Sequence, residues 1–165
     1  MLWHCPAKTY KVFPPCGVEY FSKLNPLEGA PDPIIKIVSL SQFRSEKDHP
    51  LQIRILYQLR ELLREHEWNR VRLVVMGSCR HPEEFARVKD MEDLCKHLSV
   101  EEHVEFKVNI TFEELEQELS SSLIAIHTMM NEQFGIGELR TDASKKKYEG
   151  FVEKVESIIV PGFLY

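Results

Sequence analysis

The 165-residue sequence has no apolar run long enough to cross a bilayer. A membrane-spanning helix needs about 20 consecutive apolar residues. The longest apolar run, residues 123–130, has only the length of a β-strand and includes His127. The N-terminus also lacks the long apolar region of a secretory signal peptide. We therefore expect this chain by itself to be soluble and cytosolic, without a membrane span.

Cysteine is scarce, and its spacing indicates no cross-link. The four cysteines, Cys5, Cys16, Cys79 and Cys95, form no Cys-x-x-Cys pair. This argues against a zinc site or a disulfide framework and favours a reducing environment. The sequence also contains no Asp-x-Asp motif and no histidine-rich cluster, so no metal is predicted.

Positive charge is not in excess either. With 26 acidic and 21 basic residues, the formal net charge is -5 at pH 7. Because proteins that bind nucleic acids present a basic face to the phosphates, nucleic acid is not an expected partner. Residues 145–147 are consecutive lysines, but membrane-binding clusters usually hold roughly 4–8 basic residues. We interpret these lysines as part of a solvated helix face.

What the sequence does contain is the composition of one globular domain. Hydrophobic residues make up 43% of the chain and charged residues 28%, and this length can bury a core. Prolines at positions 6, 14, 15, 26, 31 and 33 account for most of the nine in the chain. Residues 1–33 show no periodicity, so they are predicted to form an extended lead-in.

From residue 34 onward, short β-branched runs alternate with amphipathic stretches. The predicted strands are residues 34–40, 71–76, 104–108 and 123–126, and the predicted helices are residues 50–67, 85–98 and 111–119. Thr111 and Glu114 have the spacing of a capping box at the start of the last helix. This alternation predicts right-handed crossovers and an α/β, Rossmann-like parallel sheet covered on both faces. The domain is assigned to residues 34–137, and residues 138–165 are predicted to be a C-terminal helix and tail.

Two loops follow predicted strands at the edge where open α/β sheets bind ligands. The first, residues 41–50, supplies Arg44 and Lys47, and the second, residues 131–137, supplies Glu132 beside small residues. Fixed cations stabilise charge that grows on a diphosphate, and a carboxylate accepts hydrogen bonds from sugar hydroxyls. The pattern suits a sugar carried on a diphosphate. The alternative is that the first loop is only a solvated turn. Glu132 would then be an acid that is favoured at a helix N-terminus.

The same segments carry a family resemblance. They are Gln42-Phe-Arg-Ser-Glu-Lys-Asp-His-Pro50, Gly77-Ser-Cys-Arg80 and His127-Thr-Met-Met-Asn-Glu-Gln-Phe-Gly-Ile-Gly137. They resemble the donor-binding half of a retaining glycosyltransferase with two Rossmann-like domains, the GT-B arrangement. Among these enzymes the chain is most similar to the dolichol-pathway α-1,2-mannosyltransferases, which use GDP-mannose. The resemblance covers roughly residues 10 to 137.

This resemblance implies transfer of mannose from GDP-mannose to a dolichol-linked oligosaccharide in protein N-glycosylation. The reaction is expected on the cytosolic face of the endoplasmic reticulum membrane, with GDP-mannose as donor substrate and no further cofactor. In the family, the acceptor half is an N-terminal domain that this chain lacks. The chain is therefore interpreted as an incomplete donor-binding half, and by itself it is expected to be inactive or weakly active.

Individual residues receive roles from the resemblance. Arg44 and Lys47 are assigned to the donor diphosphate, and Glu132 is assigned to catalysis, close to hydroxyls of the transferred sugar. The loop residues Phe134, Gly135 and Ile136 are assigned to donor binding.

Gly77 and His127 are further candidates, each with a structural alternative. Gly77 would let the backbone approach the nucleotide or would simply form a tight turn. His127 offers a pH-sensitive imidazole or serves as a hydrogen-bonded scaffold.

Two positions depart from the family pattern. Ser41 stands where the family more often has glycine, which is a mild change because serine is also small. The second acid of the family's Glu-x7-Glu pattern, expected to hold the nucleotide ribose, falls at Arg140. The alternative function is therefore a catalytically inactive truncated isoform that acts at most as a nucleotide-binding or interaction module.

Overall fold

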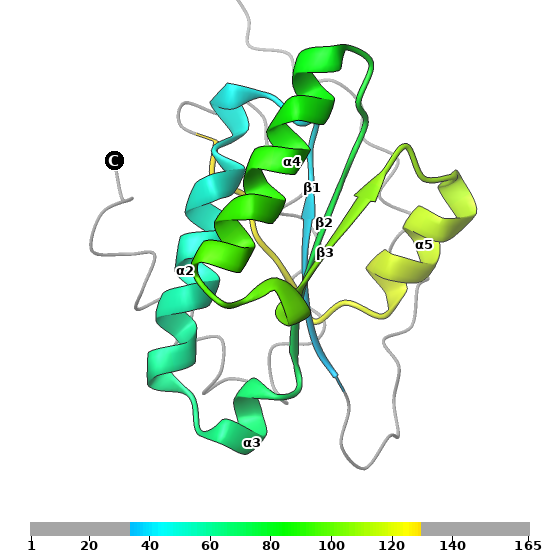
Figure 1. Ribbon diagram of the computed structural model, residues 1–165. Helices are drawn as coiled ribbons and strands as arrows, with labels where there is room; N and C mark the ends of the chain where they lie inside the picture. The colour runs from blue at the N-terminus through cyan, green and yellow to red at the C-terminus, as the bar shows by residue number, and fades with distance from the viewer. Residues whose placement is uncertain (1–33, 130–165) are drawn as a thin grey trace, which may run out of the picture.

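The computed structural model describes residues 34–129 (Figure 1). In chain order, the elements are β1 (Ile35–Leu40), the 3-10 helix η2 (Ser45–Lys47), α2 (His49–Leu62), α3 (Glu65–Trp68), β2 (Val71–Gly77), α4 (Pro82–His97), η3 (Glu101–His103), β3 (Val104–Val108), α5 (Phe112–Ser120) and β4 (Ile124–Ala125). The predicted lead-in, the second loop and the C-terminal helix lie outside the described residues.

The strands form one parallel sheet in the order β3-β2-β1-β4. These are the first four positions of the 3-2-1-4-5-6 order of doubly wound nucleotide-binding sheets. In the register, Leu40 pairs with Met76, Gly77 with Val108, and Val38 with Ala125. The predicted α/β parallel sheet is confirmed, and the carboxyl ends of its strands share one edge.

Helices cover both faces of this sheet (Figure 1). On β1, Ile35 and Ile37 belong to the larger core cluster, which the α2 and α4 side chains complete. Val38, the next residue after Ile37, belongs to a smaller cluster with Val74 and Met76, against which α5 packs. Successive residues of a strand point to opposite faces, so the near-continuous apolar runs of β1 and β2 reflect burial on both sides.

The capping box predicted for α5 is present. The Glu114 amide donates to Thr111 Oγ1 over 3.2 Å, and the Thr111 amide donates to Glu114 Oε2 over 2.8 Å. The predicted strands also match, although the ladder assigned to β4 is shorter than the expected residues 123–126.

The helix predicted over residues 50–67 is wrong in one respect, because the structure divides it. The chain is extended at Leu63, with φ -99° and ψ 148°. A new turn, α3, begins at Glu65, and its carboxyl-terminal residue Trp68 is buried and stacks on His103 with ring centroids 3.9 Å apart. A single helix continuing from α2 could not turn the Trp68 side chain to this position. Burial of the indole therefore requires the break at Leu63.

The prediction for α4 also differs at one position. Its apolar stripe is buried at Val88, Met91 and Cys95, but Phe85 is 51% exposed. The helix begins at Pro82, and Glu84, not Phe85, turns toward the sheet in the first turn. A polar contact at the sheet edge therefore determines how this end of α4 is oriented.

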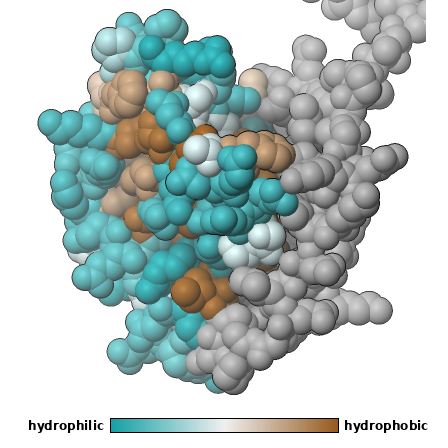
Figure 2. All heavy atoms as spheres, turned by 90° about the vertical axis from the view of Figure 1, so that its right-hand side faces the viewer, coloured by the Kyte–Doolittle hydropathy of each residue, from teal (hydrophilic) through white to brown (hydrophobic). Residues whose placement is uncertain are grey.

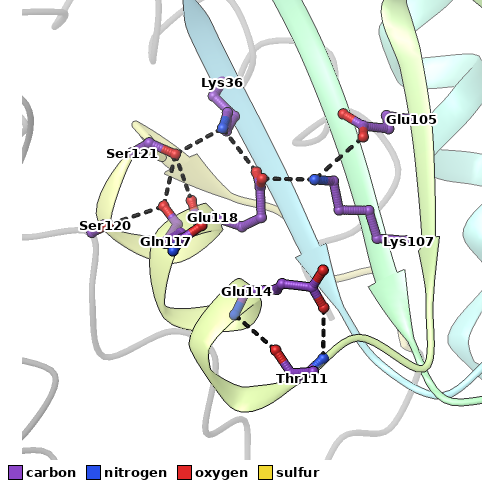
Figure 3. A network of polar contacts seen from close by, with 9 residues as sticks. All are labelled: Lys36, Glu105, Lys107, Thr111, Glu114, Gln117, Glu118, Ser120 and Ser121. Carbon is purple, nitrogen blue, oxygen red and sulfur yellow. Dashed lines mark hydrogen bonds and ion pairs between the residues drawn. The ribbon is translucent and has the colours of Figure 1, made fainter.

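A charged network attaches α5 to the sheet (Figure 3). Glu118 Oε2 accepts from Lys36 Nζ, and Glu118 Oε1 accepts from Lys107 Nζ, each over 2.8 Å. Burial opposes ionisation of this carboxyl, but the hydrogen bonds from the two lysines outweigh it and hold the pKa of Glu118 below its ordinary value.

On the α5 side, the surface formed by the described residues is mostly hydrophilic and shows separate apolar patches (Figure 2). Within residues 34–129, no helix has both the length and the apolar character needed to span a membrane.

Candidate functional site

The first loop passes directly over the end of β2, and Gly77 makes this possible. A Cβ atom on Gly77 would lie 2.0 Å from the carbonyl oxygen of Ser41 and 3.1 Å from Cε2 of Phe43. The Ser41 amide also donates to the Met76 carbonyl over 3.0 Å. Gly77 is therefore required for close packing of the first loop, which is a structural role at the predicted site. Whether it also approaches a nucleotide stays a prediction.

Arg44 lies in this loop, exposed at the edge of the sheet. Its Nε is 3.4 Å from Oε1 of the buried Glu84, whose other oxygen accepts from the amides of Arg80 and His81. The Arg80 amide is the main reason that the pKa of Glu84 lies below its ordinary value, despite burial. An ionised carboxylate thus holds Arg44 through Nε, the nitrogen nearest the chain. The terminal nitrogens form the fork that suits phosphate oxygens.

Lys47, the last residue of η2, lies beside the segment that follows β4. Its Nζ is 2.9 Å from the sulfur of Met129, and its carbonyl accepts from the hydroxyl of Thr128 over 2.7 Å. The second loop follows Met129 directly in the sequence. The structure therefore brings the predicted cation next to the residues that lead into the predicted sugar-binding loop. Glu132, Phe134, Gly135 and Ile136 themselves lie outside the described residues, and their roles stay predictions.

A buried histidine that sequence reasoning missed organises the first loop. His49 Nε2 lies 2.8 Å from Ser41 Oγ, and its ring stacks on Phe43 with centroids 5.2 Å apart. Burial, followed by the charges of His127 and Lys47, lowers the pKa of His49 to about 4. His49 is therefore neutral at physiological pH. The available signals were its place in the segment that carries the family resemblance and its position directly before Pro50, at the start of a helix.

The same electrostatic coupling gives information about His127. This half-buried residue contributes to the lowered pKa of His49, so its ring lies near that of His49. The structure therefore brings the predicted Arg44, Lys47, Gly77 and His127 to one edge of the sheet, as the sequence suggested. Their binding roles are not tested by this placement alone.

Asn109 fastens the loop after β2. It adopts a left-handed conformation with φ 56°, which asparagine tolerates better than most residues. Its side-chain oxygen accepts from the Cys79 amide over 2.9 Å, and its side-chain nitrogen donates to the Cys79 carbonyl over 3.0 Å. Specific polar contacts therefore hold the loops after β1, β2 and β3 in place at this edge of the sheet. The edge is preorganised.

A groove of about 520 Å³ separates the first loop from the start of α4. Residues 43–46 line one side, and residues 81–84 together with Arg87 line the other. Besides Arg44, it contains Arg87, a second guanidinium that sequence reasoning did not identify. No group of three or more potential metal-ligating side chains occurs within residues 34–129.

Comparisons with known proteins agree on one enzyme class. The family model for group 1 glycosyl transferases matches residues 25–138. The GDP-Man:Man(3)GlcNAc(2)-PP-Dol alpha-1,2-mannosyltransferase of Xenopus laevis is 42% identical over 136 residues, which are 82% of this chain and 28% of that protein. The human enzyme of the same name is 42% identical with the same coverage. The Caenorhabditis elegans enzyme is 35% identical over 81% of this chain and 29% of its own length.

The chain therefore spans only about 28% of the length of these curated relatives. Among solved structures, WaaG, a glycosyltransferase involved in lipopolysaccharide biosynthesis, matches 66% of this chain and 26% of its own. The sequence identity is 20% and the TM-score is 0.48.

Proposed function

Because the chain belongs to the group 1 glycosyltransferases, we propose that it binds GDP-mannose at the carboxyl edge of its sheet. The donor diphosphate lies against Arg44 and Lys47, and the mannose lies toward the loop that contains Glu132. The observation that carries this proposal is the contact between Lys47 and Met129, 82 residues apart in sequence. It joins the loop that holds the cations to the segment that leads into the predicted sugar-binding loop.

The proposed reaction transfers mannose to a dolichol-linked oligosaccharide with retention and forms an α-1,2 linkage. The bond between the anomeric carbon and the phosphate oxygen breaks, and its electron pair remains on the GDP leaving group. Arg44 and Lys47 stabilise the negative charge that grows there, and they need no reorganisation because loop contacts already hold them. A new bond forms between the anomeric carbon and an acceptor hydroxyl, whose proton passes to the phosphate oxygen of the departing GDP.

The acceptor surface is expected in the parts of the relatives that this chain does not match. A transferase of this kind closes two domains around the reacting centre, which excludes water. We therefore expect the 165-residue chain to bind donor and to transfer mannose weakly or not at all by itself. The complete enzyme would act on a lipid-linked acceptor at the cytosolic face of the endoplasmic reticulum membrane.

A second function is favoured by one observation. Arg140 stands where the family pattern has its second acid. If that exchange removes ribose recognition, the chain is a catalytically inactive module that binds nucleotide poorly or serves for interaction.

Calorimetric titration of GDP and GMP into the 165-residue chain tests the proposal. GDP is expected to bind about tenfold more tightly than GMP, because only GDP carries the second phosphate that both cations contact. Arg44→Gln is expected to remove most of this difference. Arg54→Gln, which removes an equal charge from an exposed position on α2, is the matched control. Equal affinities for the two nucleotides, or no heat with either, would contradict donor binding and favour the interaction module.

A further inference from the structure

A buried polar connection joins α2 to the segment that follows β4, next to the first loop. The side chain of Gln52 on α2 donates through Nε2 to Thr128 Oγ1 over 2.9 Å. The Thr128 hydroxyl in turn lies 2.7 Å from the Lys47 carbonyl and 3.1 Å from the Asp48 carbonyl. Gln52 is 1% exposed and Thr128 is 8% exposed. The connection therefore lies inside the protein, away from solvent.

The Thr128 hydroxyl uses both of its hydrogen-bonding functions in this connection. It accepts from Gln52, and it donates its single proton toward the two carbonyls. The two carbonyls flank the turn between η2 and α2, where Asp48 has a left-handed φ of 46°. The Asp48 carbonyl also accepts from the Leu51 amide over 3.0 Å, and the Lys47 carbonyl accepts the shorter of the two contacts from Thr128, at 2.7 Å.

An apolar residue at position 128 would be simpler to bury. Polar groups inside a protein lose free energy when they are not fully paired, and Gln52 Oε1 has no hydrogen-bond partner within the described residues. The geometry that the connection specifies is the backbone position of Lys47. Thr128 holds this backbone by donating to the lysine carbonyl, and the next residue, Met129, contacts the lysine Nζ.

We propose that Thr128, oriented by Gln52, is a positioning residue that holds Lys47 at the donor diphosphate and keeps the first loop in register with the end of β4. This inference rests on the proposed function of Lys47. Thr128 itself contacts no substrate in this arrangement. Its effect on donor binding is exerted through the backbone of Lys47. This effect is distinct from a contribution to the stability of the whole domain.

The first test is a double-mutant cycle measured by GDP calorimetry on the 165-residue chain. Thr128→Val keeps the shape of the side chain and removes the hydroxyl. It is expected to weaken GDP binding about fivefold to tenfold, while Thr128→Ser, which restores the hydroxyl, stays within about twofold of the natural protein. In a Lys47→Met background, Thr128→Val is expected to change affinity less than about twofold, because the group through which it acts is gone. An equal loss in both backgrounds would overturn the proposal.

The second test needs no nucleotide, so it separates this inference from the proposed function. Hydrogen exchange is measured at the Lys47 and Asp48 amides, which donate to Arg44 and Ser45 carbonyls over 3.2 Å each. Thr128→Val is expected to accelerate exchange at these two amides about tenfold and to leave the β2 amides unchanged. Unchanged exchange in the loop would overturn the inference, whether or not GDP binds.

Two variants make the result interpretable. Ser122→Ala removes a hydroxyl that donates to the Leu119 carbonyl at the end of α5, away from the first loop, and is expected to leave loop exchange unchanged. If Thr128→Val does not fold, Gln52→Met removes the donor to Thr128 and is expected to accelerate the same two amides to a smaller extent. If the natural chain binds no GDP, the proposed function fails, and exchange alone decides whether Thr128 holds the loop.

Discussion

The sheet carries charged side chains in two regions, and they use their charges differently. Beneath α5, one carboxylate, Glu118, receives a lysine on each oxygen at 2.8 Å (Figure 3). At the carboxyl edge, Arg44 contacts Glu84 through one nitrogen at 3.4 Å, and Lys47 contacts a thioether, which is a weak acceptor. In the first region, the carboxylate is paired with a lysine on each side, and these pairs attach α5 to the sheet. The second region places Arg44 and Lys47 at the carboxyl edge of the sheet, where we propose that the donor diphosphate binds.

Gly77→Ala gives the largest expected effect, because it removes the space in which the first loop lies. The new Cβ would meet backbone at Ser41, which cannot move like the end of a flexible side chain. We expect a loss of about 3 kcal/mol in the free energy of unfolding. Urea denaturation measures this, with Ser78→Ala as the neighbouring control. An unchanged unfolding midpoint would show that the loop is not held against β2.

Glu118→Gln is expected to lower the free energy of unfolding by about 2 kcal/mol at pH 7, since two lysines lose their shared partner. The pKa of Glu118 is lowered in the folded state. Its stabilisation is therefore fully present above its unfolded pKa of about 4.3 and is lost as pH falls through the folded pKa.

The difference in free energy of unfolding between the natural protein and Glu118→Gln should accordingly shrink as pH falls below about 4. Urea denaturation between neutral and acidic pH follows it, with Glu102→Gln as an exposed control. GDP affinity is expected to be unaffected. A constant difference at all pH values would mean that the ionised carboxylate is not what fastens α5.

Arg44→Gln and Lys107→Gln test the two regions against each other. Arg44→Gln should weaken GDP binding about tenfold with little change in stability, because its side chain is 45% exposed. Lys107→Gln should leave GDP affinity unchanged and lower stability by about 1 kcal/mol. Calorimetry and urea denaturation on both variants measure the contrast. If both variants change both quantities equally, the distinction between the regions is wrong.

Arg140→Glu has the smallest expected effect. It introduces the acid that the family pattern has at this position, and a carboxylate accepts hydrogen bonds from ribose hydroxyls. We expect GDP affinity to rise about threefold, which corresponds to one modest hydrogen bond. Calorimetry measures it, and Arg140→Leu, which removes the positive charge without adding an acceptor, separates the two effects. Equal effects of the two variants would argue against ribose recognition at this position.

Much of the fold could be predicted because its signals are local. β1 and β2 are short β-branched runs, β3 alternates apolar and polar residues, and Thr111 and Glu114 satisfy helix amides within a single turn. The alternation of strands and helices then restricts the topology to a parallel sheet with one ligand edge. These local patterns alone placed Arg44, Lys47, Gly77 and His127 at that edge.

The tertiary structure decided what depends on partners far away in the sequence. The break after Leu62 exists because Trp68 is buried against His103, and Phe85 is exposed because Glu84 reaches the first loop. Gly77 is explained only by the carbonyl of Ser41, and the backbone of Lys47 only by Thr128, 81 residues later. Periodicity reports which face of an element is apolar, but it does not report which residue of another element meets that face. That pairing is set by packing of the whole domain.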